Sequence, residues 1–340
     1  MKLARYSPKL ISVALLALAM TMAGALAASV ANAASDYYAE GSFDRTLKVS
    51  GAVDLTIATG SGSISVRSGD ASSVHVNARI RVSEGWHISD SEAKDKVSKL
   101  EANPPIEQDG NTIRIGEIRD EELRHNVSIS YEVVTPAESR LHSSTGSGSQ
   151  TIDGVRGPVE ATTGSGGLRI SRIGAELRAS TGSGTITLDD IKGSVRATTG
   201  SGSIRAMGIA GGLSAVTGSG TVELEQTAAG DVDVQTGSGG IELRGVHGRL
   251  SARAGSGHIS ADGVPTGDWR LHTGSGGVTL HLPADAGFEL EASTGSGTIS
   301  TTHELTVSGI IGSRHELRGK AHGGGPLISA STSSGSIRVE

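Results

Sequence analysis

Two short motifs near the C-terminal end combine side chains that often hold metal ions. His303-Glu304-Leu305 and His315-Glu316-Leu317 repeat a His-Glu pair, and His322 follows them. Imidazole and carboxylate groups are common ligands of zinc and related ions. The two motifs lack the His-Glu-x-x-His spacing that places two imidazoles on one helix face. We therefore predict an exposed polar loop and assign no metal ligand.

Nucleophilic and acid–base chemistry has two further candidates. Ser91-x-x-Lys94 has the form of the penicillin-binding nucleophile motif, but its partner motifs are absent. Asp189 and Asp190 form an acidic pair, the residue type that sugar-cleaving enzymes use as acid and base, but no neighbouring acidic cluster joins them. We predict a protein without catalytic residues. The alternative left open is a β-helix enzyme acting on an envelope or extracellular polysaccharide.

The usual cofactor motifs are also missing. The chain has no Cys, which removes disulfides, thiolate metal sites and thiol nucleophiles. Its glycines never form G-x-x-x-x-G-K-[ST], nor a G-x-G-x-x-G that opens a helix after a strand. We predict no cofactor and no cofactor-binding residue.

Composition and charge narrow the class of partner. The 340 residues include 30 Lys+Arg and 36 Asp+Glu, a net charge of −6, and 50 glycines. No basic field exists to release counterions from a nucleic acid, so we predict no nucleic-acid partner. The glycines do not fall at every third position, which excludes collagen.

The first 33 residues have the pattern of a signal peptide. Lys2, Arg5 and Lys9 form a basic start, residues 10–28 are mostly apolar, and Ala31-Asn32-Ala33 is a small-x-small cleavage site. No second apolar stretch of about 18 residues follows, so we expect no transmembrane anchor after cleavage. We predict an exported protein that is periplasmic, associated with the outer membrane or extracellular.

One four-residue motif recurs along the chain and sets the positions of the other features. Thr-Gly-Ser-Gly begins at Thr59, Thr145, Thr163, Thr181, Thr199, Thr217, Thr236, Thr273 and Thr294. Variants begin at Ala254 and Thr332. Counting Ala254, the steps from Thr145 to Thr273 are 18, 18, 18, 18, 19, 18 and 19 residues. A fixed period of this length is typical of stacked coils.

Apolar residues recur at five positions of each unit, counted from the first residue of the motif. Position 6 holds Leu168, Ile186, Ile204, Val222, Ile241, Ile259, Val278 and Ile299; position 8 holds Ile170, Leu188, Ala206, Leu224, Leu243, Ala261 and Leu280; position 11 holds Val155, Ile173, Ile191, Ile209, Val246 and Val264; position 15 holds Val159, Leu177, Val195, Leu213 and Leu250; and position 17 holds Ala161, Ala179, Ala197, Ala215 and Ala252. The alternation at 6 and 8, and at 15 and 17, predicts two short strands per unit, each with one buried face.

These patterns predict the fold class: all-β, a single-chain β-solenoid of ~18-residue coils stacked at the inter-strand spacing of about 4.8 Å. Calcium-binding β-rolls use coils of similar length, but their ligand Asp would fall at position 6, which is aliphatic here. His258, His272 and His281 fall in different columns, so we expect them at the surface. Whether the Thr and Ser of the motif face inward or outward stays open. An outward Thr-x-Ser array would indicate an ice-binding surface.

Two longer segments interrupt the regular coils. We predict a first coil and a helix-containing excursion over residues 40–140, regular coils over 141–301, and a C-terminal excursion with a last coil over 302–340. In the first excursion, Ser89 and Glu92 form a capping box. Ala93, Val97 and Leu100 then share one helix face, and the helix ends at residues 103–105, Asn-Pro-Pro. We expect strands at Val74–Ile80, Thr112–Ile115 and Val127–Val133, and expect both excursions to protect the open ends of the stack.

Residues 40–340 resemble the bacterial Toastrack family, adhesin-like β-solenoids of unknown function in envelope proteins. The segments that carry the resemblance are Phe43–Val49, Leu55–Gly62, Val133–Pro136 before Leu141, Leu280–Ala284 and Gly323–Pro326. The resemblance implies a β-solenoid and a role linked to adhesion or to the sensing of envelope stress. It supplies no catalytic residues.

The expected function is that of an exported, non-catalytic binding or structural module of the bacterial cell envelope. Its partner would be an envelope or surface component, or a second copy of the chain. Charge is unevenly spread, because residues 163–210 have a net charge of +3 and residues 217–243 of −5. Like charges also stack in neighbouring coils, Arg178 on Arg196 and Glu223 on Glu242. Such contacts are unfavourable unless they are screened or paired.

Overall fold

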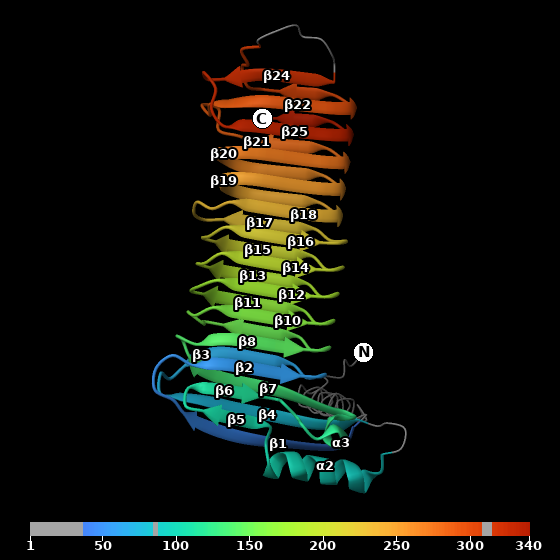
Figure 1. Cartoon of the computed structure of the whole chain (residues 1–340). Helices are drawn as coiled ribbons and strands as arrows, with labels where there is room; N and C mark the ends of the chain where they lie inside the picture. Colours follow the sequence, from blue (N-terminus) through green and yellow to red (C-terminus); the bar gives the residue numbers. More distant parts are fainter. Residues whose placement is uncertain (1–36, 84–87, 308–314) are drawn as a thin grey trace, which may run out of the picture.

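The fold was analysed in a computed structural model, which describes residues 37–83, 88–307 and 315–340. The predicted signal peptide, residues 1–33, lies outside the described residues. The stack forms a nearly straight column of parallel strands (Figure 1). The expected β-solenoid is therefore confirmed.

Each regular coil contributes one strand to each of two parallel ladders. The first ladder contains β8 (Arg140–Thr145), β10 (Val159–Thr163), β12 (Leu177–Thr181), β14 (Val195–Thr199), β16 (Leu213–Thr217) and β18 (Val232–Ser238). The second contains β9 (Gln150–Asp153), β11 (Leu168–Ile173), β13 (Ile186–Ile191), β15 (Ile204–Ile209) and β17 (Val222–Gln226). Two longer strands, β19 (Ile241–Ser256) and β20 (Ile259–Ser275), run through both ladders. Pairing between coils is in register, so that residues at the same position of the repeat are partners.

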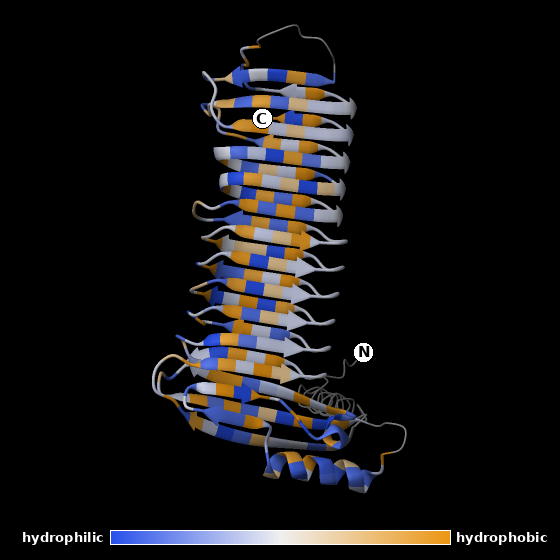
Figure 2. Cartoon of the chain, in the orientation of Figure 1, coloured by the Kyte–Doolittle hydropathy of each residue, from blue (hydrophilic) through white to orange (hydrophobic). Residues whose placement is uncertain are grey.

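The interior is filled by the aliphatic columns. Hydrophobic and polar residues alternate along the strands (Figure 2), and the columns at positions 6, 8, 15 and 17 point into one shared core. Ile299 is only half-buried. Val264 was predicted in the core but is 37% exposed. The register shifts between β19 and β20, so that Val264 pairs with His247 while Pro265 is buried instead.

The Thr and the Ser of each motif differ in burial. Thr199 is buried and Ser201 is exposed, and the other regular coils follow the same pattern. The outward Thr-x-Ser array that an ice-binding surface requires is therefore not formed by these motifs. The Gly at position 4 is required by close contact: a Cβ on Gly202 would lie 1.9 Å from the carbonyl oxygen of Gly184.

Each motif Thr from Thr145 onward links its own corner to a neighbouring coil. The Thr199 Oγ1 donates to the carbonyl oxygen of Gly184 at 2.9 Å and accepts from the amide of Gly202 at 3.1 Å. The same donation to a Gly carbonyl of a neighbouring coil recurs at Thr145, Thr163, Thr181, Thr217, Thr236, Thr273, Thr294 and Thr332. The hydroxyls are thus buried with their hydrogen bonds made, which removes the cost of burying them.

We expect Thr199→Val to lower the free energy of unfolding by about 1–3 kcal/mol, because it leaves a buried carbonyl and a buried amide without partners. The chain offers the reciprocal test at Ala254, which pairs with Thr236 and Thr273 on either side but has no hydroxyl. Ala254→Thr should raise stability by about 0.5–1.5 kcal/mol. Urea unfolding followed by circular dichroism measures both. Equal stability of Thr199→Val and the unchanged protein would contradict the role of the hydroxyl.

The N-terminal end is capped by a second, mostly antiparallel layer. It consists of β1 (Tyr37–Lys48), β4 (Ser73–Ser83), β5 (Ile106–Asp109), β6 (Thr112–Ile115), β7 (Val127–Pro136), α2 (Asp90–Ala102) and α3 (Glu121–Arg124). The first coil of the chain, β2 (Asp54–Thr59) and β3 (Ile64–Gly69), lies between this cap and the coil of β8 and β9. The strands expected at Val74–Ile80, Thr112–Ile115 and Val127–Val133 are confirmed.

The predicted helix is confirmed as α2. Ser89 and Glu92 make both hydrogen bonds of the capping box. The Ser89 amide and hydroxyl both donate to the Glu92 carboxylate, which lowers the pKa of that carboxyl. Ala93, Val97 and Leu100 are buried. The helix contacts β1 and so covers the end of the stack.

The C-terminal end has a coil inserted out of sequence order. Its strands are β21 (Val278–His281), β22 (Phe288–Ser296), β23 (Ile299–Thr301), β24 (Glu316–Ala321), β25 (Leu327–Ser334) and β26 (Ile337–Val339). β25 lies between β20 and β22, and β26 lies between β21 and β23. The last coil in sequence is therefore held on both sides, and the antiparallel strand β24 covers the outer edge of β22.

Candidate functional site

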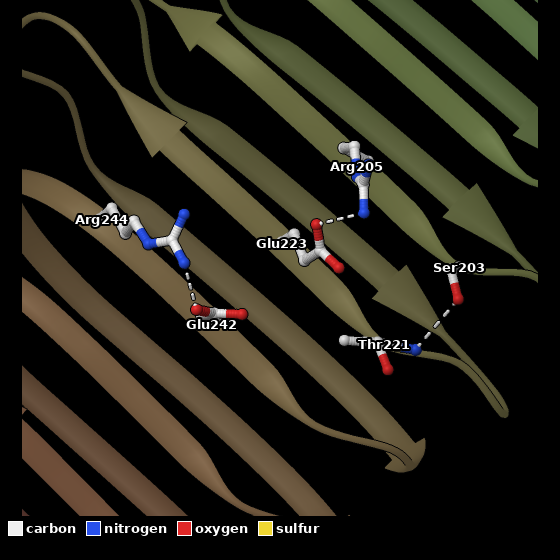
Figure 3. Close-up of polar contacts among 6 residues, drawn as sticks. All are labelled: Ser203, Arg205, Thr221, Glu223, Glu242 and Arg244. Carbon is white, nitrogen blue, oxygen red and sulfur yellow. Dashed lines mark hydrogen bonds and ion pairs between the residues drawn. The ribbon is translucent and has the colours of Figure 1, made fainter.

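The outward residues of the second ladder form one candidate site. We call it the carboxylate face, and it consists of the residues at positions 5, 7 and 9 of the repeat along β11, β13, β15, β17 and the first halves of β19 and β20. Its centre is a set of paired charges (Figure 3). Arg205 Nη2 lies 2.8 Å from Glu223 Oε2, and Arg244 Nη2 lies 2.5 Å from Glu242 Oε1. Glu223 and Glu242 are register partners on β17 and β19. This arrangement places two carboxylates one coil apart.

The two arginines resolve the like-charge contact predicted from the sequence. Each glutamate has its own guanidinium, which offsets the repulsion between the carboxylates. Sequence reasoning identified the stacked glutamates and missed these ion pairs. The signal was present, because Arg205 precedes Glu223 in the same column and Arg244 follows Glu242 by two residues.

A groove with a volume of about 520 Å³ forms the second candidate site, on the first ladder. We call this surface the groove face: the outward residues of β10, β12, β14, β16, β18 and the second halves of β19 and β20, with the residue just before each strand. The groove exists because Gly212, Ser214 and Ser251 are small, while Arg196 and Arg253 extend on either side. Both ladders point their aliphatic residues into one core, so the carboxylate face and the groove face point away from each other.

The stacked arginines on the groove face differ in their partners. Arg178 Nη2 lies 2.8 Å from Glu176 Oε1. Arg196, its register partner, has no carboxylate within ion-pair distance in the part of the chain that the structure describes. The sequence predicted the contact between the two arginines but could not show which of them has a counter-ion.

Two histidines of the C-terminal excursion contact other groups of the protein. The His303 ring packs edge-on against Phe288, with ring centroids 5.3 Å apart. The His322 Nε2 lies 2.9 Å from the carbonyl oxygen of Ala284. Within residues 37–83, 88–307 and 315–340, no group of three or more His, Asp or Glu side chains is placed to hold a metal ion.

We expect the fold to persist when metals are removed, because aliphatic residues occupy the columns in which β-rolls place calcium ligands. Far-ultraviolet circular dichroism and the melting temperature should be unchanged in excess chelator. A β-sheet signal that disappears with chelator and returns with calcium would contradict this expectation.

The residues considered for hydrolytic chemistry are not assembled into a site. The Ser91 hydroxyl lies 3.1 Å from the Ser89 hydroxyl at the helix start, and Lys94 pairs with Asp90 at 3.7 Å. Asp190 pairs with Lys192 at 2.6 Å in an exposed turn.

One buried titratable group was not anticipated from the sequence. Burial raises the pKa of the Tyr131 phenol, which packs edge-on against Phe43 in the N-terminal cap. Its hydroxyl is buried and has no hydrogen-bond partner among the residues that the structure describes. This phenol remains neutral and lies inside the cap, away from both faces.

The fold defines a β-solenoid protein with flat, charged outer faces. The family model described as Toastrack DUF4097 matches residues 175–340. This match confirms the resemblance to the Toastrack family over residues 175–340. No curated protein sequence matches the chain.

Three solved structures are similar to the chain, and each comparison covers 88% of it. The structure of a candidate lipid-binding protein from Parabacteroides distasonis is 17% identical and covered to 97%, with a TM-score of 0.43. That of a candidate adhesin from Bacteroides fragilis is 9% identical and covered to 97%, with a TM-score of 0.31. That of a candidate cell adhesion protein from Clostridium sporogenes is 11% identical and covered to 99%, with a TM-score of 0.19. None of the helices in the described residues has the length and apolar character needed to cross a membrane.

Proposed function

We propose that the protein is an exported, non-catalytic binding module of the bacterial cell envelope, with an adhesin-like role. The observation that supports this proposal best is the form of the carboxylate face. Its polar columns repeat at one-coil steps along a rigid, in-register stack. A long flat face suits an extended partner better than a small molecule, because small-molecule sites are concave and mostly apolar. The basic start and the cleavage site in residues 1–33 support export.

The chemistry of this face favours a hydroxyl-rich envelope polymer as the partner. Ser203 and Thr221 stand beside the paired charges of Arg205 and Glu223 (Figure 3). Hydroxyl, carboxylate and guanidinium groups can together donate to and accept from the hydroxyls of a sugar chain. Repetition at each coil would let several weak contacts act together along one polymer.

The test is retention of the purified protein on immobilised envelope polysaccharide isolated from its own cell. We expect retention without shortening of the polymer. Glu242→Lys should weaken retention about tenfold, because it places an unpaired cation beside Arg244. Arg178→Glu, on the groove face, should leave retention unchanged. Absence of retention on any envelope fraction would contradict the proposal.

A second candidate function has one observation in its favour. The register pairing of Glu223 with Glu242 places two carboxylates in adjacent coils, the residue type that glycoside-cleaving β-helix enzymes require. The same experiment separates the two roles. Reproducible shortening of the polysaccharide that Glu242→Gln abolishes would establish the enzyme and defeat the non-catalytic proposal.

A further inference from the structure

One coil of the groove face is a midpoint for the charges around it. Where a charged residue at a given distance on one side of this coil has a charged counterpart at the same distance on the other side, the two charges have opposite sign. The position 16 column, in register from coil to coil, reads Glu160, Arg178, Arg196, Ser214, Asp233, Ser251 and Arg270. Ser214 is the midpoint. One coil away on either side, Arg196 is matched by Asp233, and three coils away Glu160 is matched by Arg270.

The neighbouring column has the same property. The residues just before the strands read Glu176, Ser194, Gly212, Asp231 and Arg249. Gly212 belongs to the same coil as Ser214, and Glu176 and Arg249 lie two coils away from it on opposite sides. The two columns therefore share one midpoint, about which positive and negative groups exchange places.

We infer that the groove face binds a second copy of this chain, antiparallel, about a two-fold axis through the coil of Gly212 and Ser214. The axis runs in the interface along the strand direction, so each column faces its own copy in reversed order. Arg196 then meets Asp233 of the second copy, and Glu176 meets Arg249 of the second copy. Such a two-fold contact uses the same surface on both subunits.

The charge order selects this axis over its neighbours. An axis one coil earlier would place Arg196 against its own copy, and an axis one coil later would do the same for Asp233. An axis parallel to the stack and over the position 16 column would place every residue of that column opposite its own copy, and so Arg196 again against Arg196. Like charges brought together in this way oppose association.

The second copy would supply carboxylates to the two arginines of this face that have none in their own copy. In the described part of the chain, the guanidinium groups of Arg196 and Arg249 have no carboxylate within ion-pair distance. Asp233 is only loosely paired, 3.8 Å from Arg253. Val216, in the midpoint coil, is 39% exposed and would be covered. The long Arg196 side chain of the second copy would enter the groove beside Asp231 and Asp233.

The area and the charge of the contact indicate a weak dimer. Seven coils at about 4.8 Å and five residues at about 3.3 Å give a face of about 34 by 16 Å, or about 1,100 Å² buried over both copies. This area is at the low end for specific interfaces, and the pairs are charged at the rim. We therefore expect a dimer with a dissociation constant in the micromolar range that weakens as salt is added.

Sedimentation velocity of the purified protein across a concentration series tests the dimer. Arg196→Asp alone and Asp233→Arg alone should each weaken dimerisation at least about tenfold, because each brings like charges together across the axis. The double variant Arg196→Asp/Asp233→Arg should restore it, since the swapped charges again meet their opposites. Arg169→Asp, on the carboxylate face, is the matched control and should dimerise normally. A protein that stays monomeric, or a double variant that fails to recover, would overturn the inference.

A second measurement locates the axis and uses the absence of Cys in the chain. Ser214→Cys should be cross-linked between two copies by a bis-maleimide reagent with a span of about 10 Å, because this residue faces its own copy across the axis and packed sheets lie about 10 Å apart. Ser251→Cys lies in the same column two coils away, so its copy would be about 19 Å distant along the stack, beyond the reach of the same reagent. Equal cross-linking of the two variants would refute this axis. Neither measurement depends on the envelope-binding role, which uses the carboxylate face.

Discussion

Ile204→Asp is expected to lower the free energy of unfolding by about 4 kcal/mol or more, because it places an unpaired charge in a dry interior. Ile204 is fully buried on β15, between its register partners Ile186 and Val222. No cation lies in the aliphatic column to pair with the new carboxylate. Thermal melting followed by circular dichroism, together with limited proteolysis around this coil, measures the effect.

The matched control is Val264→Asp, which makes the same kind of change at a position where the side chain is 37% exposed. We expect its effect to stay within about 0.5 kcal/mol. The periodicity alone predicted both residues in the core, whereas the structure buries only Ile204. Different effects of the two substitutions would therefore support the structure over the periodicity. An unchanged melting temperature for Ile204→Asp would show that the register of the columns is wrong.

Deletion of residues 327–340 is expected to disrupt the C-terminal end of the stack. The deletion removes β25 and β26, and with them the pairings of β20 and β21 on one side and of β22 and β23 on the other. The segment from residue 282 to 326 would then have no ladder to join, because its strands pair with the stack only through the deleted coil. Limited proteolysis with mass spectrometry should show cleavage there, while residues 37–281 remain resistant.

Arg338→Ala is the control for this deletion. Arg338 lies on β26 but points outward, and its ion pair with Glu340 is exposed, so its loss should change stability by less than about 1 kcal/mol. A cleavage pattern of the deletion variant identical to that of the intact chain would contradict the inserted position of the last coil.

The repeat made the regular part of the fold predictable. Alternating aliphatics specified both strands of a coil, and Ser89 with Glu92 specified the start of α2. The order of coils at the C-terminal end was not predictable, because Ile328 has the same local pattern whichever coil it pairs with. Its partners Trp269 and Leu290 are distant in sequence, and only the packing of the whole end selects them.

The candidate sites were predicted less completely, for a physical reason. Stacking of Glu223 on Glu242 follows from the period alone, because the period fixes which backbones are neighbours. The ion pairs depend on side-chain conformations, which the period does not fix, so Arg205 and Arg244 were missed. The groove depends on side-chain size along a column, with Ser214 between the longer Arg196 and Asp233, and becomes visible only when the columns are compared across coils.

The inserted last coil also determines how the protein would bear mechanical load. A force applied at the C-terminal end of β26 acts on a coil that is hydrogen-bonded on both sides. In a stack ordered strictly by sequence, the same force would peel the outermost coil, which is bonded on one side only. Here the pairings with the coils on both sides must break together before the last coil comes free. A surface protein held at this end would therefore resist pulling at the place where a simple repeat is weakest.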